Sequence, residues 1–134
     1  SNMFHRSMYY LTNDDTDWIL DKRINAGLIA DVEKVDSMTY EITEDRLRDF
    51  LALIKKAREK GTDVTLILAP YYPAYLGKVN NLEDFINEVE ESSGLTVHDY
   101  SAFVNKDEFF SDYMHLNKRG SRLFIRKLHE DGIL

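Results

Sequence analysis

The sequence predicts an α/β fold, a three-layer α/β/α sandwich built around a short parallel sheet. Two short apolar runs, each next to a turn signal, have the character of buried strands. Three stretches with apolar residues at helical spacing alternate with these runs. The order helix–strand–helix–strand–helix requires right-handed crossovers, so the strands should be parallel and covered by helices. A chain of 134 residues with 43% hydrophobic residues is large enough for one such core.

The first helix and strand are predicted directly after residue 42. Thr43 has a side chain suited to an N-cap, and Gly61 is placed to end the helix. Between them the apolar residues recur at the spacing of one helix face: Leu47, Phe50, Leu51, Ile54 and Ala57. Residues 64–69 follow as an apolar run rich in β-branched side chains, which predicts a buried parallel strand ending at Pro70.

The second half of the pattern repeats this arrangement. A helix is predicted from about Leu82 to Gly94, and residues 95–97 are expected to form the next strand. A last helix should begin near Lys118 with Asn117 as its N-cap. The domain is therefore expected to span residues 43–134.

Residues 3–42 carry weaker signals. The polar cluster at residues 13–17 is suited to cap a short helix beginning at Trp18, whereas residues 26–32 show no clean period. Several aromatic residues make the segment too apolar for a disordered chain. We therefore expect an irregular segment that packs on the domain.

Composition excludes several classes of function. The chain has 24 acidic and 17 basic residues, a net charge of −7, which argues against a nucleic-acid partner. It contains no cysteine, so thiolate catalysis and cysteine-based zinc sites are ruled out. No apolar run approaches the roughly 20 residues of a transmembrane helix.

Two loops are expected to form the functional edge of the sheet, because ligands of parallel sheets bind beyond the carboxyl ends of the strands. One spans residues 70–75 and carries Tyr71, Tyr72 and Tyr75. These rings are suited either to a rim for sugar or acyl groups or to packing against the N-terminal segment. The other loop runs over residues 98–115.

The second loop ends in an Asp-x-x-His pattern, Asp112 and His115. An imidazole is the side chain best suited to act as a base near neutral pH, and a carboxylate can hold it in one tautomer. The alternative is structural, with His115 capping the last helix and Asp112 serving as a turn residue. Asp99 is interpreted as a loop or capping carboxylate, and a metal site joining His98 to His115 is not expected because too few ligands are present.

The block from residue 63 to the C-terminus resembles the C-terminal part of the SGNH (GDSL-type) hydrolases and acyltransferases. The resemblance is carried by three segments: Leu66-Ile67-Leu68-Ala69-Pro70, Val97-His98-Asp99-Tyr100-Ser101, and Asp112-x-x-His115-Leu116-Asn117. It is closest to bacterial members that act on acyl groups of the cell envelope or of polysaccharides. In general form the fold would be flavodoxin-like.

The resemblance implies a Ser-His-Asp triad in which His115 is the general base and Asp112 orients it. The serine block of that family is not found here, and neither Ser7, Asn25 nor Gly27 lies in a matching context. We therefore expect the chain to be the C-terminal part of an ester hydrolase or O-acyltransferase whose serine lies upstream, inactive by itself. The implied substrate is an ester-bearing small molecule or an acylated glycan, with no cofactor and no metal, and the cell envelope is the favoured location.

Two other functions compete with this interpretation. A non-catalytic α/β binding or assembly module of the same fold would present an exposed sheet edge, through which copies of the chain could associate. A phosphate- or nucleotide-binding domain is disfavoured, because no glycine-rich loop precedes a predicted helix.

Overall fold

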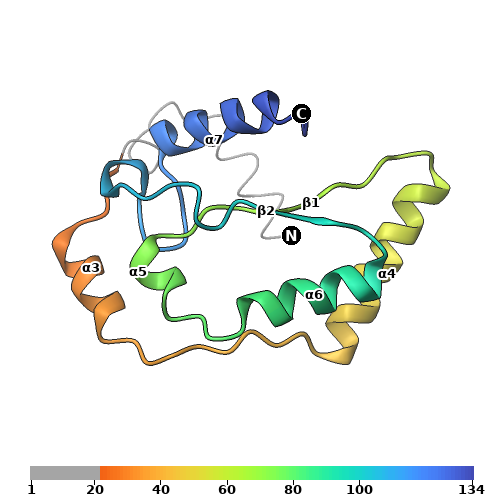
Figure 1. Ribbon diagram of the computed structural model, residues 1–134, viewed down its shortest axis with the longest axis horizontal. Coiled ribbons are helices and arrows are strands. Elements are labelled where there is room, and N and C mark those ends of the chain that lie inside the picture. The colour runs from red at the N-terminus through yellow and green to blue at the C-terminus, as the bar shows by residue number, and fades with distance from the viewer. Residues whose placement is uncertain (1–21) are drawn as a thin grey trace, which may run out of the picture.

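Figure 1 shows a computed structural model of the chain, which describes residues 22–134. Helices and strands alternate along it, and the two strands pair in parallel, so the predicted α/β class is confirmed. The elements are α3 (Ala26–Glu33), α4 (Glu44–Glu59), β1 (Leu66–Leu68), α5 (Pro73–Leu76), α6 (Leu82–Ser93), β2 (Val97–Asp99), the 3₁₀ turn η2 (Asp107–Phe109) and α7 (Lys118–Glu130).

The strand pair lies between helices (Figure 1). Leu66 pairs with Val97 and Leu68 with Asp99, so β1 and β2 end at the same edge. Helices α4 and α6 lie on one side of the strands and α7 lies on the other (Figure 1). The loops that follow the two strands therefore leave the sheet together.

The predicted ends of the three long helices agree with the structure. The side chain of Thr43 accepts a hydrogen bond from the backbone N–H of Arg46 at the start of α4. At the end of α6, Gly94 has a φ of 69°, the left-handed conformation that glycine adopts without strain. Asn117 caps α7 through a 3.0 Å bond from the N–H of Gly120. Local sequence signals determined these boundaries.

The strands differ from the prediction in length and position. β1 covers three residues rather than residues 64–69, and β2 begins at Val97 rather than at Leu95. The reason for the second shift is the helix before it, because the N–H of Leu95 bonds to the hydroxyl of Ser93 and the N–H of Val97 to the carboxylate of Glu90. Residues 95 and 96 thus complete the turn out of α6.

The segment before residue 43 is more regular than predicted. Helix α3 forms within it, capped by Asn25, whose side-chain oxygen accepts from the N–H of Leu28 at 3.0 Å. Ile24 and Val32 are buried and fasten this segment to the rest of the chain. The apolar residues of α3 show no clean helical period, because Val32 is the one buried residue of this helix. The helix predicted at Trp18 lies outside the described residues.

The best-packed core lies beneath the loops rather than on the sheet. Its buried members come from the N-terminal segment, α5 and the long loop after β2: Ile24, Val32, Tyr72, Tyr75, Val104 and Phe110. By contrast, Ile67 in β1 is 37% exposed, so the prediction of a fully buried strand was wrong. Among residues 22–134, no helix has the length and apolar character needed to cross a membrane.

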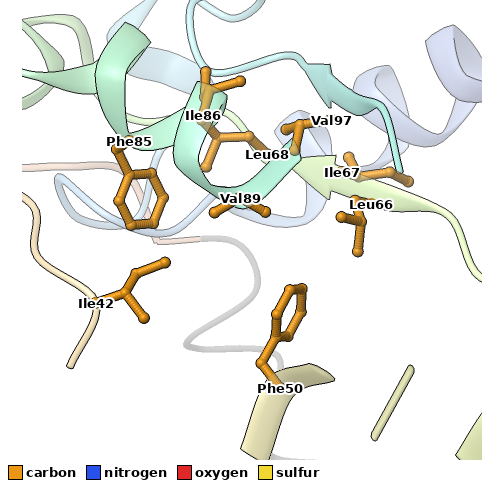
Figure 2. A pocket seen from close by; sticks show the side chains of 9 residues that line it. All are labelled: Ile42, Phe50, Leu66, Ile67, Leu68, Phe85, Ile86, Val89 and Val97. Atoms are coloured by element: carbon orange, nitrogen blue, oxygen red, sulfur yellow. The ribbon is translucent and has the colours of Figure 1, made fainter. Parts of the chain in front are cut away.

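An apolar cavity of about 270 Å³ separates the sheet from its covering helices. Figure 2 shows Phe50 of α4 and Phe85 of α6 turned toward it, opposite Leu66 of β1 and Val97 of β2. Its lining consists only of aliphatic and aromatic side chains. This side of the sheet is therefore covered but not filled.

Candidate functional site

The structure brings the two predicted loops together. The N–H of Tyr71 donates to the carbonyl oxygen of Ser101 at 3.0 Å, and the N–H of Tyr72 donates to that of Tyr113 at 3.1 Å. The rings of Tyr75 and Tyr113 stack with their centroids 5.2 Å apart. Backbone and ring contacts thus join residues 70–75 to the end of the long loop, and this edge carries the candidate site.

Residues 111–115 form a tight loop closed by its own backbone. Phe110 and Leu116 pair as an isolated antiparallel bridge at its base. The carbonyl oxygen of His115 accepts from the N–H of Ser111 at 2.9 Å and from its hydroxyl at 3.2 Å. This closure returns the chain on itself and sets Asp112 beside His115.

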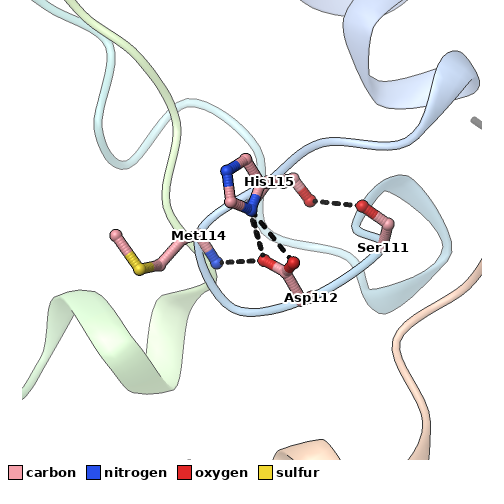
Figure 3. Close-up of polar contacts among 4 residues, drawn as sticks. All are labelled: Ser111, Asp112, Met114 and His115. Carbon is pink, nitrogen blue, oxygen red and sulfur yellow. Dashed lines mark hydrogen bonds and ion pairs between the residues drawn. The ribbon is translucent and has the colours of Figure 1, made fainter. Parts of the chain in front are cut away.

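The carboxylate of Asp112 holds the imidazole of His115 (Figure 3). Nδ1 of His115 lies 2.9 Å from one carboxylate oxygen and 3.0 Å from the other. The nearer oxygen also accepts from the backbone N–H groups of Met114 and His115, each at 2.8 Å. The backbone of the loop therefore holds the carboxylate of Asp112 in place, and this carboxylate in turn orients the ring of His115.

The second ring nitrogen of His115 is turned away from Asp112 (Figure 3). When Nδ1–H donates to the carboxylate, Nε2 carries the free lone pair of the neutral imidazole. The side chain of His115 is 72% exposed and that of Asp112 is 38% exposed. The pair can thus offer a base to a group that approaches from outside. The alternative in which His115 caps α7 is wrong, since Asn117 provides that cap.

The loop is fastened to the start of α7 by Asn117, which is 2% exposed. Its side-chain nitrogen donates to the carbonyl oxygens of Glu108 at 2.7 Å and of Lys22 at 3.3 Å. A Cβ atom at Gly120 would collide with the carbonyl oxygen of Phe109, so α7 can approach the loop only with glycine there. The sequence pattern His-Leu-Asn-x-x-Gly carried this signal, but only the helix cap was predicted from it.

The three predicted tyrosines occupy different environments. Tyr72 is buried, and its hydroxyl donates to a carboxylate oxygen of Asp107 at 3.0 Å. Burial first, and then Asp107, raise the pKa of Tyr72 above its ordinary value. Tyr71 and Tyr75 line an open hollow of about 480 Å³ beside the Asp112–His115 loop, although Tyr75 also belongs to the buried core with Tyr72. Of the three rings, Tyr72 alone does not border this hollow.

The hollow also contains residues that the sequence did not single out. Its lining is Thr39, Tyr40, Glu41, Tyr71, Tyr75, Phe85 and Met114. Burial first, and then the neighbouring phenols of Tyr75 and Tyr71, raise the pKa of Tyr40 above its ordinary value. No local signal marked Tyr40, because long-range contacts bring it here. One of them is the 2.7 Å bond from its N–H to the side chain of Asn81.

The remaining sequence candidates have structural environments. A carboxylate oxygen of Asp99 accepts from the N–H of Ser101 at 2.9 Å, as expected for a loop carboxylate. Asn25 caps α3, and Gly27 lies inside that helix. Ser7 is outside the described residues. Across residues 22–134, no group of three or more His, Cys, Asp and Glu side chains is placed to hold a metal ion.

Comparison with known proteins gives one family. The model of the family described as DltD protein matches residues 21–121, well over half of the chain and including Asp112 and His115. Neither the curated proteins nor the solved structures give a match. The DltD family is related to the SGNH hydrolases, in keeping with the resemblance carried by the sequence, and it points to D-alanylation in the cell envelope. The chain therefore belongs to the DltD family.

Proposed function

Since the chain belongs to the DltD family, we propose that it provides the His-Asp part of a Ser-His-Asp triad that transfers or hydrolyses acyl esters of the cell envelope. The substrate class is an ester-bearing small molecule or an acylated glycan, and the family favours a D-alanyl ester. The observation that carries the proposal is the pairing of Nδ1 of His115 with both oxygens of Asp112 at the exposed edge of the fold.

The chemistry follows from this pairing. A serine hydroxyl from an upstream segment would attack the ester carbonyl carbon while Nε2 of His115 takes the hydroxyl proton. Asp112 would stabilise the imidazolium that forms. The imidazolium would then return the proton to the departing alcohol oxygen as the ester C–O bond breaks. A second hydroxyl or a water would accept the acyl group by the reverse sequence, and these steps need no cofactor.

A pair of chains tests the proposal. We expect the 134-residue chain to hydrolyse p-nitrophenyl acetate no faster than background, because the serine block of the triad enzymes is not found in its sequence. A longer polypeptide that adds the upstream serine-bearing region should be active. In that polypeptide His115→Ala and Asp112→Asn should each lower kcat by about 10³–10⁴-fold.

His129→Ala is the matched control, because His129 lies at the exposed end of α7, where it contributes a basic side chain to the last turn. Its activity should equal that of the unchanged enzyme. Serine-esterase turnover by the short chain would contradict the assignment of the nucleophile to an upstream segment. Full activity of both dyad variants would contradict the role of the dyad.

A second candidate function is a non-catalytic assembly module, supported by the open edge of the strand pair. In residues 22–134 the sheet consists of β1 and β2 alone, and Ile67 is 37% exposed. Such an edge can pair with another strand, including one from a second copy. Sedimentation that depends on protein concentration, and that Ile67→Lys abolishes, would favour this module, particularly if the dyad variants leave the activity of the longer polypeptide unchanged.

A further inference from the structure

The hollow beside the dyad presents hydrogen-bond acceptors and ring faces to a ligand. Glu41 contributes a carboxylate, and among the described residues no lysine or arginine lines the hollow. The hydroxyl of Thr39 donates to the side-chain oxygen of Asn80 at 3.0 Å, so toward the hollow it can only accept. This composition favours a ligand that donates hydrogen bonds and carries positive charge.

The aromatic rings around the hollow strengthen this bias. The ring of Tyr71 lies 5.5 Å from that of Tyr75, and Phe85 packs edge-on against Tyr40 at 5.4 Å. Aromatic faces of this kind attract ammonium groups through their negative quadrupole.

Met114 links the hollow to the dyad. Its side chain lines the hollow, and its backbone N–H donates to the Asp112 oxygen that also contacts the His115 ring. A small group held in the hollow would therefore lie next to the tight loop of residues 111–115. An α-aminoacyl ester has its ammonium two bonds from the ester carbonyl carbon, so its two ends suit two adjacent sites.

We propose that the hollow lined by Tyr40, Glu41, Tyr71 and Tyr75 binds the ammonium group of an α-aminoacyl ester. This inference rests on the proposed acyl chemistry for its choice of ester, but it concerns binding alone. Glu41 supplies the charge and the tyrosines supply ring faces and phenol oxygens. The dyad then lies beside the carbonyl group, and acyl groups without an ammonium are bound less tightly.

The test is a titration of the 134-residue chain followed by ¹H–¹⁵N NMR at about pH 6, where an α-amino group is protonated. The probe is D-alanine methyl ester, and the comparison ligand is methyl D-lactate, which replaces the ammonium with a hydroxyl. We expect the first to shift the amide signals of Tyr40, Glu41 and Met114. We expect methyl D-lactate to bind about 5-fold more weakly, the size of a partly exposed cation–π contact.

Two substitutions sharpen the result. Glu41→Gln should weaken the binding of D-alanine methyl ester about 3-fold. Glu91→Gln, the same change at an exposed position on α6, should leave it unaltered. Equal affinity for the two esters, or unchanged binding by Glu41→Gln, would overturn the proposal. So would a methyl glycoside that shifts the same signals more strongly.

Binding in this titration requires neither a serine nor turnover, so its failure is distinguishable from failure of the proposed function. If the dyad variants keep full activity but the ammonium ester binds at Glu41, the catalytic proposal fails and the binding site stands. If the dyad variants lose activity but both esters bind alike, the catalytic proposal stands and the ammonium-binding site is contradicted.

Discussion

The tight loop that carries the dyad and the strand pair that supports it are held by different kinds of contact. Residues 111–115 are fixed by hydrogen bonds to their own backbone and rest on Phe110, which is fully buried. The strand pair has few residues, an Ile67 that is 37% exposed, and an unfilled apolar cavity beside it. Asp112 and His115 are therefore positioned by local hydrogen bonds, whereas the sheet depends on looser packing against its helices.

Truncating one phenylalanine in each region should give the largest difference. Phe110→Ala would empty a fully buried position in the core beneath the loop and should lower the free energy of unfolding by about 4 kcal/mol. Phe50→Ala removes a ring that only borders the apolar cavity and should cost about 1 kcal/mol. Urea unfolding followed by circular dichroism measures both values. Equal losses would mean that the two regions are packed alike.

Adding one methyl group should change stability in opposite directions in the two regions. Val97→Ile extends into the cavity and should raise the free energy of unfolding by about 0.8 kcal/mol. Val104→Ile overfills a position that is 1% exposed and should lower it by about 1.5 kcal/mol. The same urea titration compares them. A stabilising effect at Val104, or a destabilising one at Val97, would reverse the assignment of tight and loose packing.

The smallest effect is expected from pH, at Tyr40, which lines the hollow together with Met114 of the tight loop. Burial raises the pKa of Tyr40 in the folded chain, so the folded state keeps a proton that the unfolded state releases. Its contribution to stability is complete below about pH 10 and falls as the pH rises beyond that value. Tyr40→Phe should therefore lose less stability than the unchanged chain between about pH 9 and about pH 11. Thermal unfolding across this range measures the two slopes, and identical slopes would show that the folded state does not retain this proton.

Sequence patterns predicted the helix boundaries and the dyad because both depend on neighbours in the chain. Thr43, Gly94 and Asn117 act within one helical turn of their own position. Asp112 and His115 are three residues apart, and the bonds that orient them come from the loop between them. A local pattern is sufficient where the contacts are local.

The strand limits, helix α3 and the hollow were not predictable in this way. The N–H of Val97 bonds to the carboxylate of Glu90 in α6, and this contact determines where β2 begins. α3 is held by the burial of Val32 against residues far along the chain. Tyr40 lies near Tyr71 and Tyr75 because the connection that carries it, between α3 and α4, passes the start of α6. A contact of this kind leaves no periodic pattern in the sequence.

The amino-acid sequence by itself determined the α/β class, the capped ends of the long helices and the proximity of a carboxylate to an imidazole, because short-range sterics and hydrogen bonds fix each of these. Only the tertiary structure decided that Tyr72 and Tyr75 belong to the core, and that Tyr75, Tyr71 and Glu41 border an open hollow next to the loop of His115. Those environments arise from contacts between segments distant in sequence, and the folding of the whole chain selects them.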